Sequence, residues 1–257
     1  MADFNDTFNA TERLLAEHRS VRRFAEREVD LATLERILEC GMRASNTGNM
    51  QMYSVVVTRD KERLQLLGAL HYGQCATAPV MLTVCADVRR YHRWCQLRGA
   101  GVCYDNFLWY LSGVIDASLC AQNICVAAES EGLGFCYLGT VLYNAKAIAE
   151  LLKLPKGVSP VITLALGYPE GETTLSERLP LDAVVHYEEY RADSDADIER
   201  QHRLREEFPF NRRMVEENGV ENLAKLFTEK RYPVDANRAI SRALLDEITR
   251  SGFMNNE

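Results

Sequence analysis

Several common motifs are missing from this chain of 257 residues, and each absence narrows the classes of protein it can belong to. It contains no G-x-G-x-x-G fingerprint and no G-K-[S/T] loop, which excludes the usual glycine-rich cradles for nucleotide phosphates. Its eight cysteines form no C-x-x-C pair and do not cluster with the five histidines, so neither a metal site nor a disulfide framework is indicated. A phosphate ligand would have to be held in some other way.

The cysteines are interpreted instead as buried thiols in a reducing compartment. Four of them lie within apolar runs, where cysteine behaves as a small hydrophobic residue: Cys85, Cys120, Cys125 and Cys136. A catalytic cysteine paired with a histidine stays open as an alternative, although no local context favours it.

The chain also lacks recognisable targeting and membrane segments. Met1–Phe4 has neither the basic start nor the apolar core of a signal peptide, so residence in the cytoplasm is expected. The most apolar helical stretch, residues 114–128, contains Asp116, Gln122 and Asn123 and is shorter than the ~20 residues that a bilayer requires.

Net charge bears on the kind of partner. The formal charge of −7 argues against nucleic acid as the main partner, because binding to a phosphate backbone normally needs a basic face. A small anionic ligand needs only a local cluster. With 47% hydrophobic and 26% charged residues and no repeat, the chain is expected to form one large or two small globular domains.

Such a local cluster occurs near the N-terminus, at residues 18–24, with the sequence HRSVRRF. The forked guanidinium groups of Arg19 and Arg22 match phosphate oxygens, and Ser20 can add a shorter hydrogen bond. The alternative is an exposed basic turn before a helix.

Periodicity predicts alternating helices and strands. Asp30 is expected to cap a helix whose apolar residues recur at helical spacing from Leu31 to Gly41. Helices are also predicted at residues 11–19, 61–70, 113–131 and 144–152, and strands at 53–58, 80–85, 135–138 and 161–166.

Two further regions allow more than one interpretation. Residues 87–104 carry a second basic and aromatic patch, which could steer a nicotinamide dinucleotide or form an exposed helix whose arginine stems cover apolar surface. Phe107, Trp109 and Tyr110 are either core residues or one wall of a pocket. Residues 191–207 are expected to be a linker or exposed helix, and 211–251 a helical arm across a partner subunit or a separate helical pair.

Three segments share the order and spacing of a known family: the basic run at 18–24, the polar loop RASNTGNMQMY at 43–53, and GLGFCYLGT at 132–140. With the later segment ERLP at 177–180, they resemble the FMN-dependent nitroreductases, in particular the oxygen-insensitive NAD(P)H nitroreductase and flavin reductase branch. The resemblance covers residues 14–190.

The resemblance implies an α+β fold with a mainly antiparallel central sheet flanked by helices, in an intertwined homodimer with an extended C-terminal helical arm. It implies an FMN-binding domain at residues 1–190 and a charged linker with a helical extension at 191–257. FMN is the expected cofactor, and NADPH or NADH the electron donor. The residues matched to the FMN site are His18, Arg19, Ser20, Arg22, Ser45, Asn46, Asn49, Gln51, Gln74, Leu138, Gly139, Thr140 and Arg178.

These matches imply three kinds of contact. Arg19, Ser20, Arg22 and Arg178 match phosphate and ribityl ligands, and the amides of the 45–51 loop match ring contacts that come from the second subunit. Gly139 lets a backbone N–H approach the reactive nitrogen, although a simple turn glycine is the alternative. Two residues depart from the family pattern: Ser176 stands where a lysine is usual, and Ser45 where proline is most common.

The expected reaction is a ping-pong cycle in which NADPH or NADH reduces FMN and a nitroaromatic, quinone or related small molecule then accepts the electrons. No side-chain catalytic residue is predicted, because the cofactor carries the chemistry. The sequence Asn211-Arg212-Arg213 resembles an arginine pair used for nicotinamide phosphate. Alternatives are a dehalogenase-like or other flavin enzyme of this fold, a non-catalytic flavin- or anion-binding module, and a helical interaction protein.

Overall fold

The computed structural model describes residues 7–256. Met1–Phe4, on which the expectation about targeting rests, therefore lies outside the described residues. Backbone contacts divide the chain into two compact units, Met1–Thr174 with Ile240–Glu257, and Leu175–Ala239.

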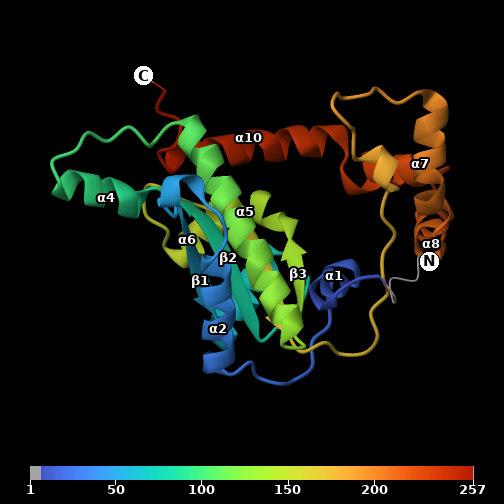
Figure 1. The fold of residues 1–257 in the computed structure, drawn as a ribbon, viewed down its shortest axis with the longest axis horizontal. Coiled ribbons are helices and arrows are strands. Elements are labelled where there is room, and N and C mark those ends of the chain that lie inside the picture. Colours follow the sequence, from blue (N-terminus) through green and yellow to red (C-terminus); the bar gives the residue numbers. More distant parts are fainter. Residues whose placement is uncertain (1–6, 257) are drawn as a thin grey trace. The chain divides into compact units, whose positions relative to one another are not determined.

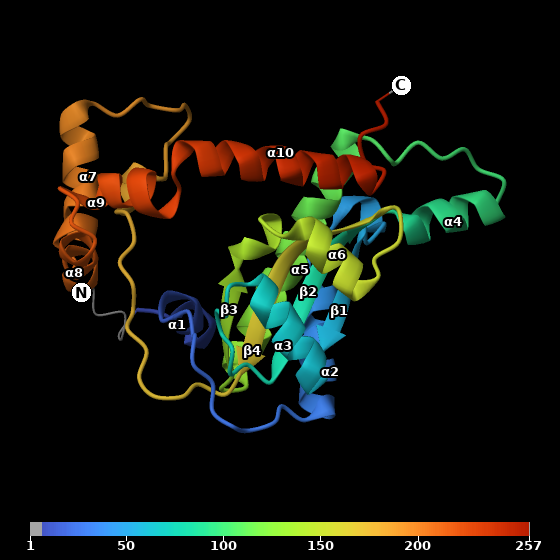
Figure 2. The ribbon, with the colours of Figure 1, turned by 180° about the vertical axis from the view of Figure 1, so that it is seen from behind.

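The first unit is built on one four-stranded antiparallel sheet. Its strands are β1 (Tyr53–Thr58), β2 (Val80–Asp87), β3 (Gly134–Leu138) and β4 (Val158–Gly167), in the order β1-β2-β4-β3 (Figures 1 and 2). Every neighbouring pair is antiparallel. The predicted α+β class with an antiparallel sheet is confirmed, and β1 and β3 form its two edges.

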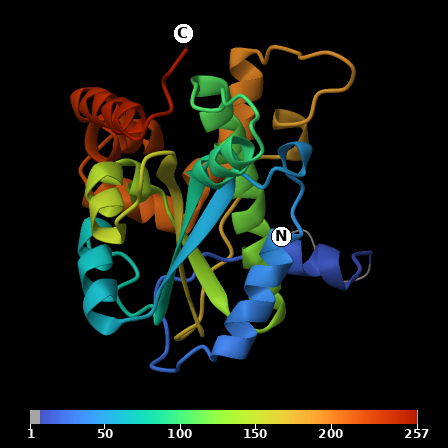
Figure 3. The ribbon, with the colours of Figure 1, turned by 90° about the vertical axis from the view of Figure 1, so that its left-hand side faces the viewer.

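Helices cover both faces of this sheet (Figure 3). On one face lie α2 (Leu31–Met42) and α5 (Phe107–Ser130), and on the other α3 (Lys61–Leu70) and α6 (Ala145–Leu152). Each face has its own cluster of buried apolar side chains, in line with the near-continuous burial of β2 and β4.

Helix α5 differs from its prediction in length. It has 24 residues and is long and apolar enough to cross a membrane by those criteria alone. In the fold it is a core helix, because nine of its residues are buried against the sheet and α2. A Cβ on Gly41 of α2 would clash with the Ile124 side chain of α5, which shows how closely the two helices approach.

The remaining helices are α1 (Ala10–Ala16), α4 (Arg89–Leu97), α7 (Asp195–Glu207), α8 (Pro209–Glu217), α9 (Leu223–Lys225) and α10 (Val234–Arg250). The predicted linker or exposed helix at 191–207 is the helix α7, which Ser194 caps. After α10 the chain packs within the first unit, where the buried Phe253 ring lies 5.2 Å from that of Tyr110. The proposed domain boundary at residue 190 stays a prediction.

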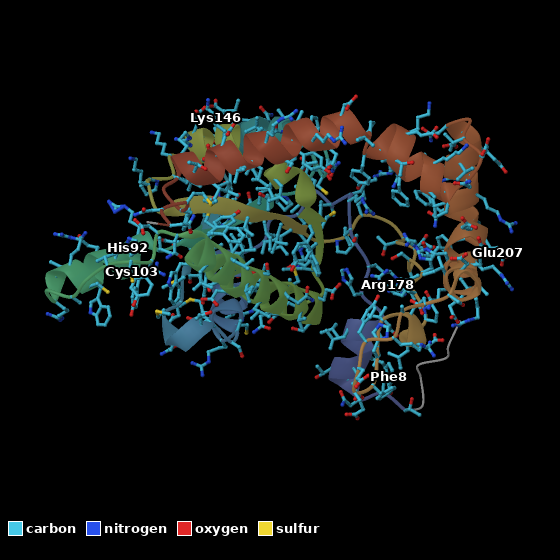
Figure 4. All side chains as sticks on the ribbon, turned by 90° about the horizontal axis from the view of Figure 1, so that it is seen from above. Phe8, His92, Cys103, Lys146, Arg178 and Glu207 are labelled. Carbon is cyan, nitrogen blue, oxygen red and sulfur yellow. The ribbon has the colours of Figure 1, made fainter. Side chains whose placement is uncertain are left out.

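All eight cysteines are free thiols. Six of them are buried, but Cys40 and Cys103 are exposed, so the expectation of buried thiols is wrong for these two. Cys103 lies in the loop that follows α4, the helix on which Figure 4 labels His92.

Candidate functional site

The basic run is an extended segment along the β3 edge of the sheet. Val21 N–H donates to the Phe135 carbonyl at 2.9 Å, and Ser20 forms a parallel bridge with Phe135. Val21 and Phe24 are buried, whereas Ser20 and Arg22 are exposed. Burial of the two apolar residues therefore anchors the segment and leaves polar groups of the run open to a ligand.

His18 at the start of the run is held by two contacts. Its Nδ1 lies 2.7 Å from Glu129 Oε1 on α5, and its ring stacks on Phe135 with centroids 4.8 Å apart. Arg19 is half-buried next to it. These contacts fix the beginning of the run against α5 and β3.

Electrostatics link the run to two other predicted segments. The Cys75 thiol, next to Gln74, hydrogen-bonds with Cys136 on β3 and lowers the pKa of Cys136, and the Arg22 guanidinium acts in the same direction while burial opposes it. Arg22, Gln74 and the strand leading to Leu138 therefore lie in one region of the first unit. Gln74 itself is exposed.

The segment after β3 combines a buried anchor with open space. Leu138 is buried, whereas a Cβ built on Gly139 would meet no atom within 4 Å. Thr140 Oγ1 lies 2.8 Å from Nδ1 of His71, which follows α3 and is fully buried. Burial lowers the pKa of His71 to about 4, because desolvation disfavours the imidazolium, so the ring is neutral at pH 7.

The polar loop before β1 lies at the opposite edge of the sheet. Asn46 Oδ1 accepts the Gln51 backbone N–H at 3.2 Å, and Gln51 Nε2 donates to Asn49 Oδ1 at 3.4 Å. Ser45 and Asn49 are exposed. One chain therefore does not bring these amides together with the segment around Gly139, because β1 and β3 are separated by two strands.

Arg178 belongs to the second unit and is exposed. Its Nη1 donates to Ser176 Oγ at 2.6 Å, so the serine at the position of the usual lysine accepts a hydrogen bond from the arginine that it accompanies. In the same unit, Asn211 Nδ2 donates to Glu177 Oε1 at 2.8 Å, and Arg213 pairs with Glu217 at 3.6 Å.

The second basic and aromatic patch includes helix α4. The ring of Tyr104 packs edge-on against Tyr91 and Trp109, with centroids 5.0 and 4.6 Å apart. Of the three aromatic residues at the start of α5, Tyr110 is buried, Trp109 is half-buried and Phe107 is 51% exposed. Core packing therefore explains Tyr110 and leaves Phe107 on the surface.

A model of the nitroreductase family matches residues 15–108 and 109–168, which together are more than half of the chain. The chain belongs to the nitroreductase family. A relative named oxygen-insensitive NADPH nitroreductase, from Salmonella typhimurium, is 36% identical over 180 residues, which are 69% of this chain and 73% of that protein. The FMN reductase (NADPH) of Bacillus subtilis is 30% identical over 191 residues, with coverage of 73% and 77%.

Solved structures agree with this membership. A crystal structure of a Bacteroides fragilis protein superposes on this member of the nitroreductase family with a TM-score of 0.92 and 39% identity. The match covers 94% of this chain and 99% of that one. A Bacillus subtilis structure titled NfrA1 nitroreductase superposes with a TM-score of 0.83 and 25% identity and covers 96% of this chain, so the shared fold includes helices after residue 190.

The sequence did not single out three residues whose side chains contact the predicted segments of this nitroreductase-family chain: His71 bonds with Thr140, Asp116 with Thr47, and Arg90 with the Gln51 carbonyl. Asp116 did carry a signal, since a carboxylate inside an apolar helix has to find donors. Nothing in the local sequence singled out His71 as the partner of Thr140. Arg90 is one of several arginines on α4, and only the fold shows which backbone groups it contacts.

Proposed function

We propose that this chain is an FMN-dependent oxidoreductase that takes electrons from NADPH or NADH and passes them to nitroaromatics, quinones or related small acceptors. Family membership supports the proposal. So do the names of two relatives, an NADPH nitroreductase and an FMN reductase that uses NADPH.

The observation that carries the proposal is the open space at Gly139 beside a fixed backbone. A Cβ at this position would meet no atom within 4 Å, and the Thr140 side chain next to it lies 2.8 Å from the buried His71 ring. No side chain therefore blocks a ligand atom from the main chain at Gly139, as the proposed contact with a flavin ring requires. These residues fit the flavin that the family binds.

The phosphate and the ribityl chain of the cofactor have candidate ligands in this chain. Arg19, Ser20 and Arg22 are proposed to bind the phosphate and ribityl chain, with His18 and Gln74 as neighbouring contacts, because guanidinium forks match phosphate oxygens. Arg178 is proposed to complete the phosphate contacts. Its guanidinium is the one positive charge of this segment, since Ser176 replaces the usual lysine and accepts a hydrogen bond from Arg178 instead.

The remaining residues orient the ring. Leu138, Gly139 and Thr140 are proposed to lie along it, while Ser45, Asn46, Asn49 and Gln51 supply donors and acceptors for its polar edge. When bound, FMN supplies the hydride-accepting and hydride-donating centre, so no side-chain acid or base is needed. The donor leaves before the acceptor binds on the same face, which makes the cycle ping-pong.

We propose a homodimer, and the separation of these groups supports it. The 45–51 loop precedes β1 and Gly139 follows β3, at opposite edges of one sheet (Figure 2). A second copy can supply the missing half of each site. Its docking face is proposed to include the exposed stripe of α5, which is spaced by four residues and formed by Phe107, Leu111, Ile115 and Leu119.

We further propose that residues 1–190 carry the FMN machinery and that 191–257 form a helical extension, of which the last part returns to the first unit. Eight free thiols support a reducing location such as the cytoplasm.

The test is the visible spectrum of purified protein without oxygen, before and after NADPH and then NADH. A bound flavin that bleaches is the expected result, and the faster donor identifies the preference. Protein that refuses added FMN would refute the assignment, and bound FMN that neither donor reduces would favour a non-catalytic flavin module.

Two neighbouring arginines provide a matched pair of variants. Arg22→Gln is expected to weaken FMN binding about tenfold, since a hydrogen-bonded charge is lost. Arg23→Gln is the control, because Arg23 is 77% exposed in its side chain and pairs with Glu170 at 3.1 Å. Equal losses in the two variants would contradict a phosphate site at Arg22.

A further inference from the structure

The loop that carries Asn49 and Gln51 has an unfavourable backbone. Asn49 and Gln51 have φ values of 56° and 52°, in the left-handed region that residues other than glycine rarely adopt. Between Asn46 and Met52 the loop contains only a single 3₁₀ turn, Thr47–Asn49. Such a conformation persists only where surrounding contacts determine it.

Asp116 on α5 provides one set of these contacts. Its side chain is buried, with the residue 1% exposed, and each of its carboxylate oxygens binds a different end of the turn. Oδ1 accepts from Thr47 N–H at 2.9 Å and Thr47 Oγ1 at 3.2 Å, and Oδ2 accepts from Met52 N–H at 3.3 Å.

No lysine, arginine or histidine forms an ion pair with Asp116 in the part of the chain that the structure describes. A buried carboxylate without a cation is costly unless donors surround it, so the amides of this loop are its compensation. The carboxylate and the strained loop therefore stabilise each other.

Arg90 on α4 provides the complementary contacts. Its Nη2 donates to the Gln51 carbonyl at 2.9 Å and to the Tyr53 carbonyl at 3.0 Å. Asp87, at the end of β2, lies 3.9 Å from Arg90 Nη1 and accepts from Arg89 N–H at 2.9 Å, which fixes the start of α4. The Asp116 carboxylate thus accepts hydrogen bonds from backbone N–H groups of the loop, and the Arg90 guanidinium donates hydrogen bonds to its carbonyls.

We propose that Asp116 and Arg90 are positioning residues that clamp the 46–53 loop, so that Asn49 and Gln51 present their amides to the flavin ring. The inference rests on the proposed function. It assigns to an acidic residue of the dimer-facing helix, and to a basic residue of α4, a specific role in cofactor affinity. Neither residue touches the cofactor in this scheme; both act through the loop.

The first test measures the loop without any cofactor. In apo-protein, hydrogen exchange of the Thr47 and Met52 amides is expected to be slow and to speed up in Asp116→Asn, whose NH₂ group cannot accept from Met52. Gln122→Glu is the matched control, since it makes the reverse exchange at an exposed site on the same helix. Unchanged exchange in Asp116→Asn would overturn the clamp.

The second test measures FMN dissociation constants in a double-mutant cycle. Asp116→Asn and Gln51→Ala are each expected to weaken binding about tenfold. The double variant is expected to lose about tenfold rather than a hundredfold, because both act through the same loop. Arg22→Gln, at the phosphate, should combine multiplicatively with Asp116→Asn, and independent losses for the Asp116 and Gln51 pair would overturn the proposal.

Arg90 supplies a variant that leaves the buried core intact. Arg90→Gln should weaken FMN binding and accelerate exchange of the loop, and Arg90→Lys should recover part of both. Arg93→Gln on the same helix is the control. The two proposals fail in different ways: wild-type protein that binds no FMN would refute the proposed function, whereas normal wild-type binding with unchanged affinity in Asp116→Asn and Arg90→Gln would refute the clamp alone.

Discussion

Acid should destabilise this protein through His71, by an amount that the structure allows to be calculated. The ring is fully buried, Nδ1 bonds with Thr140 Oγ1, and Nε2 has no partner among the described residues. Burial lowers the pKa of His71 to about 4 from an ordinary value of about 6.5. The unfolded chain therefore takes up a proton at a pH where the folded chain does not.

Because the folded pKa is the lower one, the contribution of His71 to stability is fully present above pH ~6.5 and is lost as the pH falls toward ~4. The full difference in pKa corresponds to roughly 3 kcal/mol, of which about 2 kcal/mol is lost between pH 7 and pH 5. For a urea m-value of about 3 kcal/mol/M, that loss moves the unfolding midpoint by roughly 0.7 M.

The assay compares urea unfolding of apo-protein at pH 7, 6 and 5, at one protein concentration, for wild type and His71→Gln. The variant cannot take up this proton. Between pH 7 and pH 5 its unfolding midpoint should therefore fall by roughly 0.7 M less than the wild-type midpoint, even if the variant is less stable at pH 7. Parallel curves for wild type and His71→Gln would refute a buried neutral imidazole.

Two further predictions concern cofactor access and assembly. Gly139→Ala should change the stability of apo-protein by less than about 0.5 kcal/mol, because a Cβ there meets no atom within 4 Å, yet it should weaken FMN binding in titrations. Gly101→Ala is the control, because a Cβ on Gly101 also meets no atom within 4 Å. Unchanged FMN affinity in Gly139→Ala would contradict a ring at Gly139. Ile115→Glu should convert the proposed dimer to monomer in light scattering, since Ile115 is 51% exposed in the α5 stripe, whereas Leu66→Glu on the other face of the sheet should not. A dimer that survives Ile115→Glu would place the interface elsewhere.

Local chemistry explains the elements that the sequence predicted well. The β-branched run from Tyr53 to Thr58 forms β1 with the predicted bounds, and residues 61–70 form α3. Asp30 caps α2 through Thr33 N–H at 2.9 Å, as its position before an apolar helical pattern indicated. These features depend on residues within one or two turns of each other, so a short stretch of sequence suffices.

The sequence predicted which helices and strands are buried, but not which of their individual residues are. Leu34 and Ile37 of α2 are buried, whereas Leu31, the first residue of the same helix and part of the same apolar pattern, is 55% exposed. Cys40 and Cys103 are exposed although cysteine is usually buried, because the neighbours of a residue in space, and not its type, decide its access to water.

The sequence by itself determined which residue types are available to a flavin: the basic run, the amide-rich loop and the glycine after β3. Only the tertiary structure decided how they are held, because the deciding contacts join residues far apart in the chain. Asp116 reaches Thr47 across 69 positions, and His71 reaches Thr140 across another 69. The strand order β1-β2-β4-β3 then puts the loop and the glycine at opposite edges, since hydrogen bonding between strands, and not their sequence order, sets which segments become neighbours.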